Sequence, residues 1–263
     1  MNERKELIVL KEGPICTLTI NNPEKRNALT PDCLLEITET FNALVQDKSI
    51  RVVILRGTGE KAFSAGADII AMPTRNSAGT NQVRGDSSTA SEAIQQFPYP
   101  TIAMLYGYTL GAGCILAMSC DIRIASTNVQ MGIPTSRMGL LSGHRGFKRF
   151  LDVVGYKTAM EIFLTGRSYD SKDCLSMGLV NHLVNHDQLE SYTYELANEI
   201  TRCAPLSLKG SKYILNRLAE NPVSTKEELD TFRSLRIQAS NSDDHEEAKL
   251  AFREKRSPNF KGS

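Results

Sequence analysis

Short apolar segments separated by turn residues make up the first part of the chain. Between residues 7 and 21 apolar and polar side chains alternate as far as Asn22-Pro23, which predicts a pair of strands that ends in a turn. Thr30-Pro31 then begins a segment with apolar residues every three or four positions, which predicts an amphipathic helix with Thr30 as its N-cap. The continuous apolar run at 52–55 predicts a buried strand. This order indicates an α/β layer structure.

Two later segments place small residues directly after predicted strands. A strand at 100–104 runs into a glycine-rich turn at 106–113, and a helical stretch and a further strand at 121–125 follow. An earlier loop of small residues surrounds Ala67. Small side chains let a ligand approach the backbone, and the exposed N–H groups of a strand-to-helix turn bind a partial negative charge. The turns around Ala67 and Ala112 are therefore the first candidate site.

The second half of the chain is dominated by helical patterns. A polar stretch at 72–91 precedes a short predicted helix at 93–97, and its composition is typical of either a mobile substrate loop or a disordered segment. Further helices are predicted at 146–154, 157–164, 171–177, 188–203, 205–219, 226–240 and 245–255. Strands in the first half and helices in the second predict an α/β core followed by a helical C-terminal region.

The composition is that of an ordinary globular protein and argues against several classes of function. Among 263 residues, 31 Lys and Arg oppose 30 Asp and Glu, so the net charge of +1 argues against a nucleic-acid binder that works by bulk charge. The most apolar stretch, 101–118, is interrupted by three glycines, so we interpret it as buried core and expect no membrane partner. The N-terminal residues show no apolar signal region, which predicts a cytoplasmic protein.

Cysteines, histidines and glycines do not form the common metal or cofactor motifs. The six cysteines include no C-x-x-C pair, which predicts reduced core thiols rather than a zinc site or disulfides. His182 and His186 stand four positions apart without a glutamate beside the first, which favours a structural role. Gly111 and Gly113 precede Leu116 where a dinucleotide motif needs glycine, and the P-loop and G-x-S-x-G motifs are absent. We expect no metal and no permanently bound cofactor.

Two segments resemble the signature segments of the crotonase (enoyl-CoA hydratase/isomerase) superfamily. They read FSAGADI at 63–69 and GYTLGAGCILAMSCDIRIA at 107–125. The similarity continues in the family's order through NPEKRNAL at 22–29, MGIP at 131–134, LTGR at 164–167, GLV at 178–180 and FREKR at 252–256. The resemblance therefore covers nearly the whole chain.

This resemblance implies a fold, an assembly and a substrate class. The implied fold is an α/β crotonase-like spiral of ββα turns at residues 1–200, followed by a helical C-terminal trimerisation region at 201–263. Members of the family assemble as homo-trimers or as hexamers that are dimers of trimers, and they act on acyl-CoA thioesters. Coenzyme A would then arrive as part of the substrate.

The resemblance also implies roles for individual residues. The backbone N–H groups of Ala67 and Ala112 would form an oxyanion hole around the thioester carbonyl oxygen, where loss of one donor typically costs about 3–4 kcal/mol of barrier. The family's coenzyme A contacts map to Lys25, Ala28, Ala65, Asp68, Phe252 and Lys255. Where relatives often have a lysine that contacts a phosphate, this chain has Ile70.

The chain departs from the family pattern at the two usual acid/base positions. Hydratases of the family have glutamates there, whereas this chain has Ile115 and Thr135. Neither side chain transfers a proton at neutral pH, so two-glutamate hydration is not implied. The leading candidates are His144 as general acid or base, with a solvent-facing loop histidine as the alternative, and Thr135 as a hydrogen-bonding group. Further polar candidates are Asp86, Glu92, Ser136 and Arg145.

The sequence thus predicts an acyl-CoA-binding enzyme of the enoyl-CoA hydratase/isomerase family that stabilises a thioester enolate. Two alternatives stay open. One is other enolate chemistry, by an isomerase, a decarboxylase or a hydrolase. The other is a non-catalytic acyl-CoA-binding scaffold that kept the fold and lost its acids, although the presence of both signature segments favours an enzyme.

Overall fold

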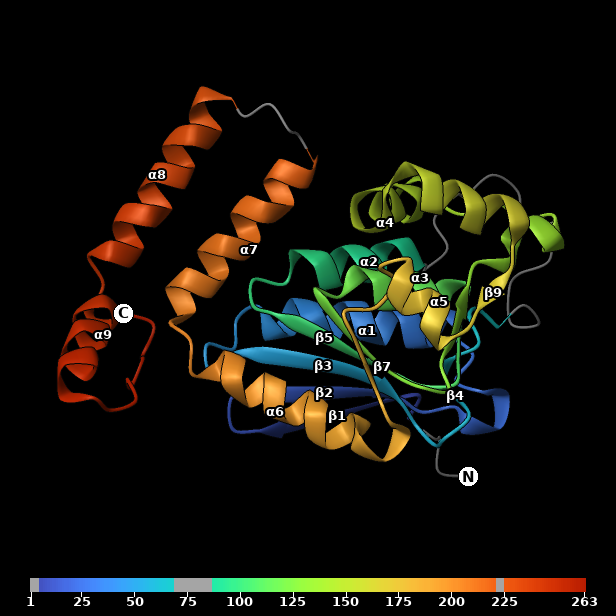
Figure 1. The fold of residues 1–263 in the computed structure, drawn as a ribbon, viewed down its shortest axis with the longest axis horizontal. Coiled ribbons are helices and arrows are strands. Elements are labelled where there is room, and N and C mark those ends of the chain that lie inside the picture. The colour runs from blue at the N-terminus through green and yellow to red at the C-terminus, as the bar shows by residue number, and fades with distance from the viewer. Residues whose placement is uncertain (1–4, 69–86, 221–224) are drawn as a thin grey trace.

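Two β-sheets form the centre of the computed structural model, which describes residues 5–68, 87–220 and 225–263 (Figure 1). The larger sheet has the strand order β1-β2-β3-β5-β7-β10, and the smaller has the order β4-β6-β8-β9. Neighbouring strands are parallel except in the pairs β1–β2 and β8–β9. The strands are β1 (Leu7–Glu12), β2 (Ile15–Ile20), β3 (Val52–Gly57), β4 (Ala62–Ser64), β5 (Thr101–Leu105), β6 (Tyr108–Leu110), β7 (Ile122–Ser126), β8 (Gln130–Gly132), β9 (Ser168–Tyr169) and β10 (His182–Val184).

Helices surround the sheets and continue beyond them at the C-terminal end. The α-helices are α1 (Pro31–Leu44), α2 (Ser87–Gln96), α3 (Ala112–Ser119), α4 (His144–Thr165), α5 (Ser171–Ser176), α6 (Leu189–Thr201), α7 (Pro205–Glu220), α8 (Lys226–Ser240) and α9 (Asp243–Glu254). Short 3₁₀ helices are η1 (Pro23–Lys25), η2 (Pro134–Met138) and η3 (His186–Gln188). Within the described ranges, no helix has the length and apolar character needed to cross a membrane.

Successive strands pass from one sheet to the other, which gives the chain a spiral path. β3, β5 and β7 lie in the larger sheet, and each is followed along the chain by a strand of the smaller sheet, β4, β6 or β8. Helices α2 and α3 come after β4 and β6, and η2 and α4 come after β8. The predicted α/β spiral of ββα turns with C-terminal helices is confirmed.

Apolar packing holds the larger sheet between helices on both faces. One face packs against α1, whose buried side chains include Ile37 and Phe41 at helical spacing. The other face packs against α6 through Leu189 and Ala197. Figure 1 shows α1, α2 and α3 on one side of this sheet and α6 on the other. Each fully buried aliphatic or aromatic side chain contributes about 1.5–3 kcal/mol, so the doubly covered sheet is a rigid support for its connecting turns.

The boundaries of two helices differ from the sequence prediction. Helix α2 begins at Ser87, whereas the pattern predicted a helix from residue 93. Its buried face includes Ala90 and Ser91, small residues that pack toward α1 and α3 but read as polar loop in the sequence. The rest of the predicted 72–91 loop, up to residue 86, lies outside the described residues. Helix α4 begins at His144 and joins two predicted helices across a break at Gly155, where φ is +74°.

The cysteines behave as core residues. Five of the six are buried and all six are free, in agreement with the predicted reduced thiols. Burial raises the pKa of Cys16 to about 11 and that of Cys33 to about 12. These thiols are therefore protonated at neutral pH and are poor nucleophiles.

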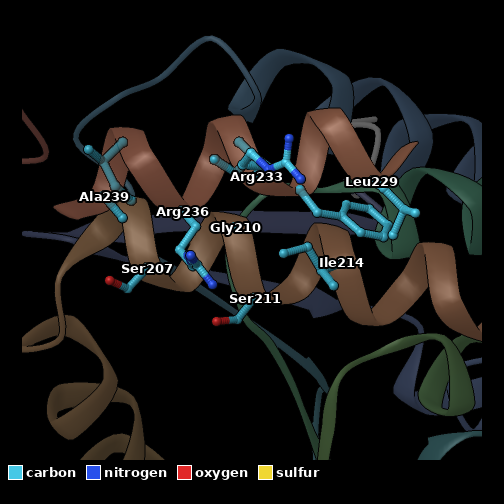
Figure 2. A pocket seen from close by; sticks show the side chains of 11 residues that line it. Ser207, Gly210, Ser211, Ile214, Leu229, Arg233, Arg236 and Ala239 are labelled. Atoms are coloured by element: carbon cyan, nitrogen blue, oxygen red, sulfur yellow. The ribbon is translucent and has the colours of Figure 1, made fainter. Parts of the chain in front are cut away.

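The C-terminal helices extend away from the sheets. Helices α7 and α8 run side by side, and a cavity of about 530 Å³ lies between them (Figures 1 and 2). Figure 2 shows Gly210 and Ser211 of α7 opposite Arg236 of α8, with Ile214 and Leu229 further along the groove. Helix α8 has no buried residue in the single chain. The division of the chain at residues 200 and 201 stays a prediction.

A buried ion pair attaches α7 to the sheet. Lys212 Nζ lies 2.6 Å from Asp121 Oδ2 and also donates to the Tyr99 carbonyl at 3.0 Å. The same Asp121 oxygen accepts from Thr101 N at 2.8 Å and from its hydroxyl at 2.9 Å. Burial lowers the pKa of Lys212, because desolvation disfavours the ammonium form, and the carboxylate opposes that shift. The pair therefore fixes α7 against the turn between α3 and β7.

Removal of this lysine should destabilise the fold. In Lys212→Ala the Asp121 carboxylate loses its cation while it stays largely buried, and we expect the free energy of unfolding to fall by about 3 kcal/mol. Urea denaturation followed by circular dichroism measures the change. The exposed Lys226 on α8 provides a control, Lys226→Ala, which should stay within about 0.5 kcal/mol of wild type. Equal effects of both substitutions would contradict the anchoring role.

Candidate active site

The two turns singled out by the sequence meet at one edge of the smaller sheet. Strand β4 leads into residues 65–68, and β6 leads through Gly111 into α3. β4 and β6 are parallel, with Ala62 opposite Tyr108, so the turns after them leave the sheet on the same side. Their proximity thus follows from the parallel pairing of the strands.

Glycines allow the two turns to touch. A Cβ atom placed on Gly113 would lie 2.6 Å from the Cβ of Ser64, closer than side-chain carbons approach. Gly66 has φ of +101°, and a Cβ there would lie 2.9 Å from the Leu110 carbonyl oxygen and 3.5 Å from Ala112 N. Both positions therefore need glycine, the first for space and the second for conformation as well.

Two backbone N–H groups at these turns have no hydrogen-bond partner among the described residues. The neighbours of Ala67 are engaged, since Leu29 N donates to Gly66 O and Asp68 N donates to Leu29 O, both at 2.8 Å, but Ala67 N–H is not. Ala112 is the first residue of α3, where helix geometry provides no acceptor, and Gly111 before it has no capping side chain. Two such donors, of which Ala112 N–H lies at a helix N-terminus, can bind an oxygen that carries negative charge.

Buried polar groups hold the loop on the Ala67 side. Asn27 has a left-handed backbone, with φ of +55°, and its buried amide donates to the carbonyls of Thr58 and Ala62 at 2.9 and 2.8 Å. Ser64 Oγ donates to Asn27 O at 2.7 Å, and Gly66 N donates to Ser64 Oγ at 3.2 Å. Asn27 and Ser64 were not among the predicted site residues. An asparagine in a turn, a residue that tolerates this conformation, was the signal present in the sequence.

Four of the predicted coenzyme A contacts lie together beside Ala67. Lys25 Nζ is 2.9 Å from Asp68 Oδ2, and the lysine side chain is 60% exposed while the aspartate is 6% exposed. Their hydrogen bond raises the pKa of Lys25. Ala65 N donates to Arg26 O at 2.9 Å and Ala28 N donates to Lys25 O at 3.1 Å, so all four residues belong to two hydrogen-bonded loops. The exposed ammonium of Lys25 is available to a charged ligand at this rim.

The other two predicted contacts lie elsewhere in the chain. Phe252 belongs to α9 and is 86% exposed, and Lys255 ends this helix in a left-handed conformation with φ of +53°. Figure 1 shows α9 at the end of the long axis opposite β4. A single chain therefore does not bring Phe252 and Lys255 to Ala67 and Ala112.

Thr135 and His144 belong to the two helices that follow β8, η2 and α4. Thr135 is partly buried in η2, shortly after Gly132, whose carbonyl accepts from Gly111 N at 2.9 Å. His144 is exposed at the first residue of α4 and lines a cavity of about 810 Å³ between α2, α4 and α7. Both predicted side chains thus follow β8 in the spiral, but neither is fixed by a hydrogen bond in the described part of the chain.

An aliphatic side chain stands one turn after Ala112 in α3. Ile115 is one turn along α3 and only 9% exposed, and a Cβ on Gly146 would lie 3.4 Å from its Cδ1. The Glu92 carboxylate forms an ion pair with Arg145, with 2.6 Å between Oε1 and the guanidinium nitrogen. Asp86 and Ile70 lie outside the described residues. Within the described ranges no group of three or more His, Cys, Asp or Glu is placed to hold a metal ion.

The contact between the turns can be tested with matched alanine substitutions. Gly66→Ala introduces both a clash with Leu110 O and a strained backbone, so we expect a loss of about 2 kcal/mol or more in the free energy of unfolding. Gly210→Ala in α7 meets open space and a helical backbone, and should be neutral or stabilise by up to about 1 kcal/mol. Urea titrations of both variants measure the difference; a Gly66→Ala protein as stable as Gly210→Ala would disprove the packing described here.

Comparison with known proteins agrees with the resemblance in the signature segments. The family model described as enoyl-CoA hydratase/isomerase matches residues 11–263. The chain is 34% identical over 258 residues to a short-chain-enoyl-CoA hydratase of Clostridium acetobutylicum, with 97% of each chain covered. It is also 34% identical to a 2,3-dehydroadipyl-CoA hydratase of Escherichia coli, with 98% of this chain and 99% of the relative covered.

The fold is shared with solved structures of similar length. A crystal structure described as an enoyl-CoA hydratase/carnithine racemase from Magnetospirillum magneticum superposes with a TM-score of 0.90 at 31% identity, covering 99% of this chain and 97% of the other. An enoyl-CoA hydratase from Bacillus anthracis superposes with a TM-score of 0.87 at 29% identity, covering 98% of this chain and 100% of the other. The chain belongs to the enoyl-CoA hydratase/isomerase family, whose members act on acyl-CoA thioesters.

Proposed function

We propose that the chain binds an acyl-CoA with its thioester carbonyl oxygen between the N–H groups of Ala67 and Ala112 and stabilises the enolate formed there. The observation that carries the proposal is the pair of N–H groups, at two touching turns, that have no partner among the described residues. An enolate develops negative charge on the thioester oxygen, so these donors bind it more strongly than the ground-state carbonyl. The proposed reaction is the enolate-forming step that hydration and isomerisation share.

The rigidity of the turns supports this role. The loop before Ala67 is held by Asn27 and Ser64, and the N-terminus of α3 is pressed against it at Gly113. Donors fixed in this way need no reorganisation when charge appears on the oxygen. The N-terminal end of the α3 dipole adds a further favourable field.

The loop of Lys25, Ala28, Ala65 and Asp68 is the proposed coenzyme A rim. The exposed Lys25 ammonium would meet a phosphate, while the buried Asp68 carboxylate orients the lysine. Coenzyme A is thus bound as part of the thioester and not as a resident cofactor. We place no metal in the reaction.

Phe252 and Lys255 would act at the site of a neighbouring copy in a homo-trimer, or in a hexamer that is a dimer of trimers. Their distance from β4 within one chain supports this arrangement. So does α8, which buries no residue in the single chain yet exposes Leu229 and Ile237. Helices with exposed apolar side chains on this scale are typical of protein–protein contacts.

Proton transfer is assigned to His144, with the Thr135 hydroxyl as a hydrogen-bonding partner of substrate or water. Imidazole exchanges protons near neutral pH, which neither Ile115 nor Thr135 does. Ile115 also supports a second candidate function, a scaffold that binds acyl-CoA without turnover, because it occupies a position where hydratases have a glutamate. Deuterium exchange at the α-carbon distinguishes the two: an enzyme exchanges the α-proton, and a scaffold binds without exchange.

The oxyanion assignment is tested by removal of one donor. Ala112→Pro deletes the N–H at the first position of α3, where proline fits a helix, so exchange of the α-proton of acyl-CoAs in deuterated water should fall roughly a hundredfold or more. Mass spectrometry measures the exchange, and circular dichroism checks the fold. Ala112→Gly keeps the N–H and should keep most of the activity. A folded, fully active Ala112→Pro protein would refute the assignment.

The role of His144 needs a separate substitution. His144→Gln retains a polar side chain but cannot transfer protons, and we expect exchange to fall roughly a hundredfold while acyl-CoA binding in calorimetry persists. His245 on α9 is another exposed histidine at the start of a helix, so His245→Gln is the matched control and should exchange at the wild-type rate. Wild-type exchange in His144→Gln would leave the proton transfer to another group.

A further inference from the structure

The cavity between α2, α4 and α7 carries an excess of positive charge. Its volume of about 810 Å³ is within the range of small-molecule sites, and its lining includes six lysines and arginines against three acidic residues. Two carboxylates outside the lining, Asp121 and Glu228, pair with Lys212 and Arg217, so a smaller excess of positive charge remains. Arg149 donates to the carbonyls of Met118 and Cys120, and Lys209 lies over the Tyr99 ring at 5.7 Å. In the described ranges neither of these two cations has a carboxylate partner. The cavity is therefore suited to an anionic group.

One end of the cavity lies close to the proposed thioester site. Arg145 lines this end, and the next residue, Gly146, would bring a Cβ within 3.4 Å of Ile115. Ile115 stands three residues after Ala112, a rise of about 4.5 Å along α3. Ser142, whose Oγ is buried with no hydrogen-bond partner in the described part of the chain, lies against the same glycine. The beginning of α4 is therefore in contact with the side chain that lies one turn after Ala112.

Arg145 is the cation best placed to receive an anion at that point. Its guanidinium is paired with Glu92 at 2.6 Å, and both side chains are partly exposed to the cavity rim, at 47% and 33%. A carboxylate from a ligand makes the same charge-assisted hydrogen bonds as Glu92 and can take its place without leaving the guanidinium unpaired. An acyl chain that ends in a methyl group forms no hydrogen bond with Arg145 or Glu92. It would shield these charged side chains from water, which costs desolvation free energy.

We propose that this cavity receives the far end of the acyl chain and selects a chain that ends in a carboxylate, with Arg145 as its partner. The inference rests on the acyl-CoA function proposed above and names the substrate class within it, an acyl-CoA with a distal carboxylate. Glu92 then competes with the substrate carboxylate for Arg145. Removal of the Glu92 carboxylate should therefore increase the affinity for the carboxylated substrate.

Calorimetric titrations with saturated CoA thioesters test this without any turnover. Glutaryl-CoA is compared with valeryl-CoA, and suberyl-CoA with octanoyl-CoA, so that each pair differs only in the terminal carboxylate. Wild type should bind the carboxylated member more tightly. Arg145→Gln should reduce the ratio of the two affinities about tenfold or more, and Glu92→Gln should raise it, because the guanidinium is freed. Lys172→Gln, a cation on α5 outside the cavity, should leave the ratio unchanged.

The outcomes separate this inference from the proposed function. If wild type binds none of the four CoA thioesters, both the proposed acyl-CoA function and the cavity assignment are overturned. Equal binding of both members, with ratios unaffected by Arg145→Gln and Glu92→Gln, would overturn the cavity assignment and leave the acyl-CoA function standing. A further titration uses free glutarate: if it binds as tightly as glutaryl-CoA and is equally weakened by Arg145→Gln, the cavity is a carboxylate site that the acyl chain does not reach. If Arg145→Gln does not fold, Glu92→Gln still tests the cavity assignment, because it should raise the ratio of the affinities for the carboxylated and the plain thioester. An unchanged ratio in Glu92→Gln would then overturn the assignment.

Discussion

The contact between two glycine-bearing turns is the constraint on which the candidate site depends. Gly113 leaves room for Ser64, and Gly66 adopts a positive φ against Leu110. Each turn follows a strand of the smaller sheet, and parallel pairing of β4 and β6 sets their relative height. The positions of the Ala67 and Ala112 N–H groups therefore depend on both the sheet register and the space between the turns, because a shift in either strand would separate Ala67 from Ala112.

A buried ion pair, between Lys212 and Asp121, fixes the position of the C-terminal helices relative to the core. Lys212 is buried where α7 meets the connection between α3 and β7, and it is satisfied there by Asp121 and the Tyr99 carbonyl. Because α7 is also a wall of the cavity next to α4, this ion pair sets the shape of the cavity as well as the direction of the C-terminal helices. Buried ion pairs contribute little net stability, and their larger effect here is on position.

Local signals in the sequence were sufficient for most of the fold. Thr30 caps α1 by accepting from Cys33 N, as the Thr-Pro start predicted, and the continuous apolar runs became strands of the larger sheet. The start of α2 was missed because its buried face is made of small residues, whose burial depends on neighbours far away in the chain. Local periodicity carries no information about such tertiary packing.

Less of the candidate site than of the fold could be predicted from the sequence. The turns at Ala67 and Ala112 were identified as segments, and the structure places them in contact. The pairing of Glu92 with Arg145 joins two helices separated by more than fifty positions, so spacing alone could not reveal it. Phe252 and Lys255 lie at helix α9, far from β4 within one chain (Figure 1), and a match to a family pattern carries no information about where the residues lie in space.

The proposed oxyanion donors at the two turns belong to the main chain, and this has an evolutionary consequence. A codon change at Ala67 or Ala112 alters a side chain and leaves the N–H in place, except for a change to proline. The surrounding side chains, such as Ile115 and Thr135, can then vary without loss of those donors. Divergence of this fold can therefore proceed by exchange of the groups around the proposed anion site, so that new reactions arise while the main-chain donors are inherited unchanged.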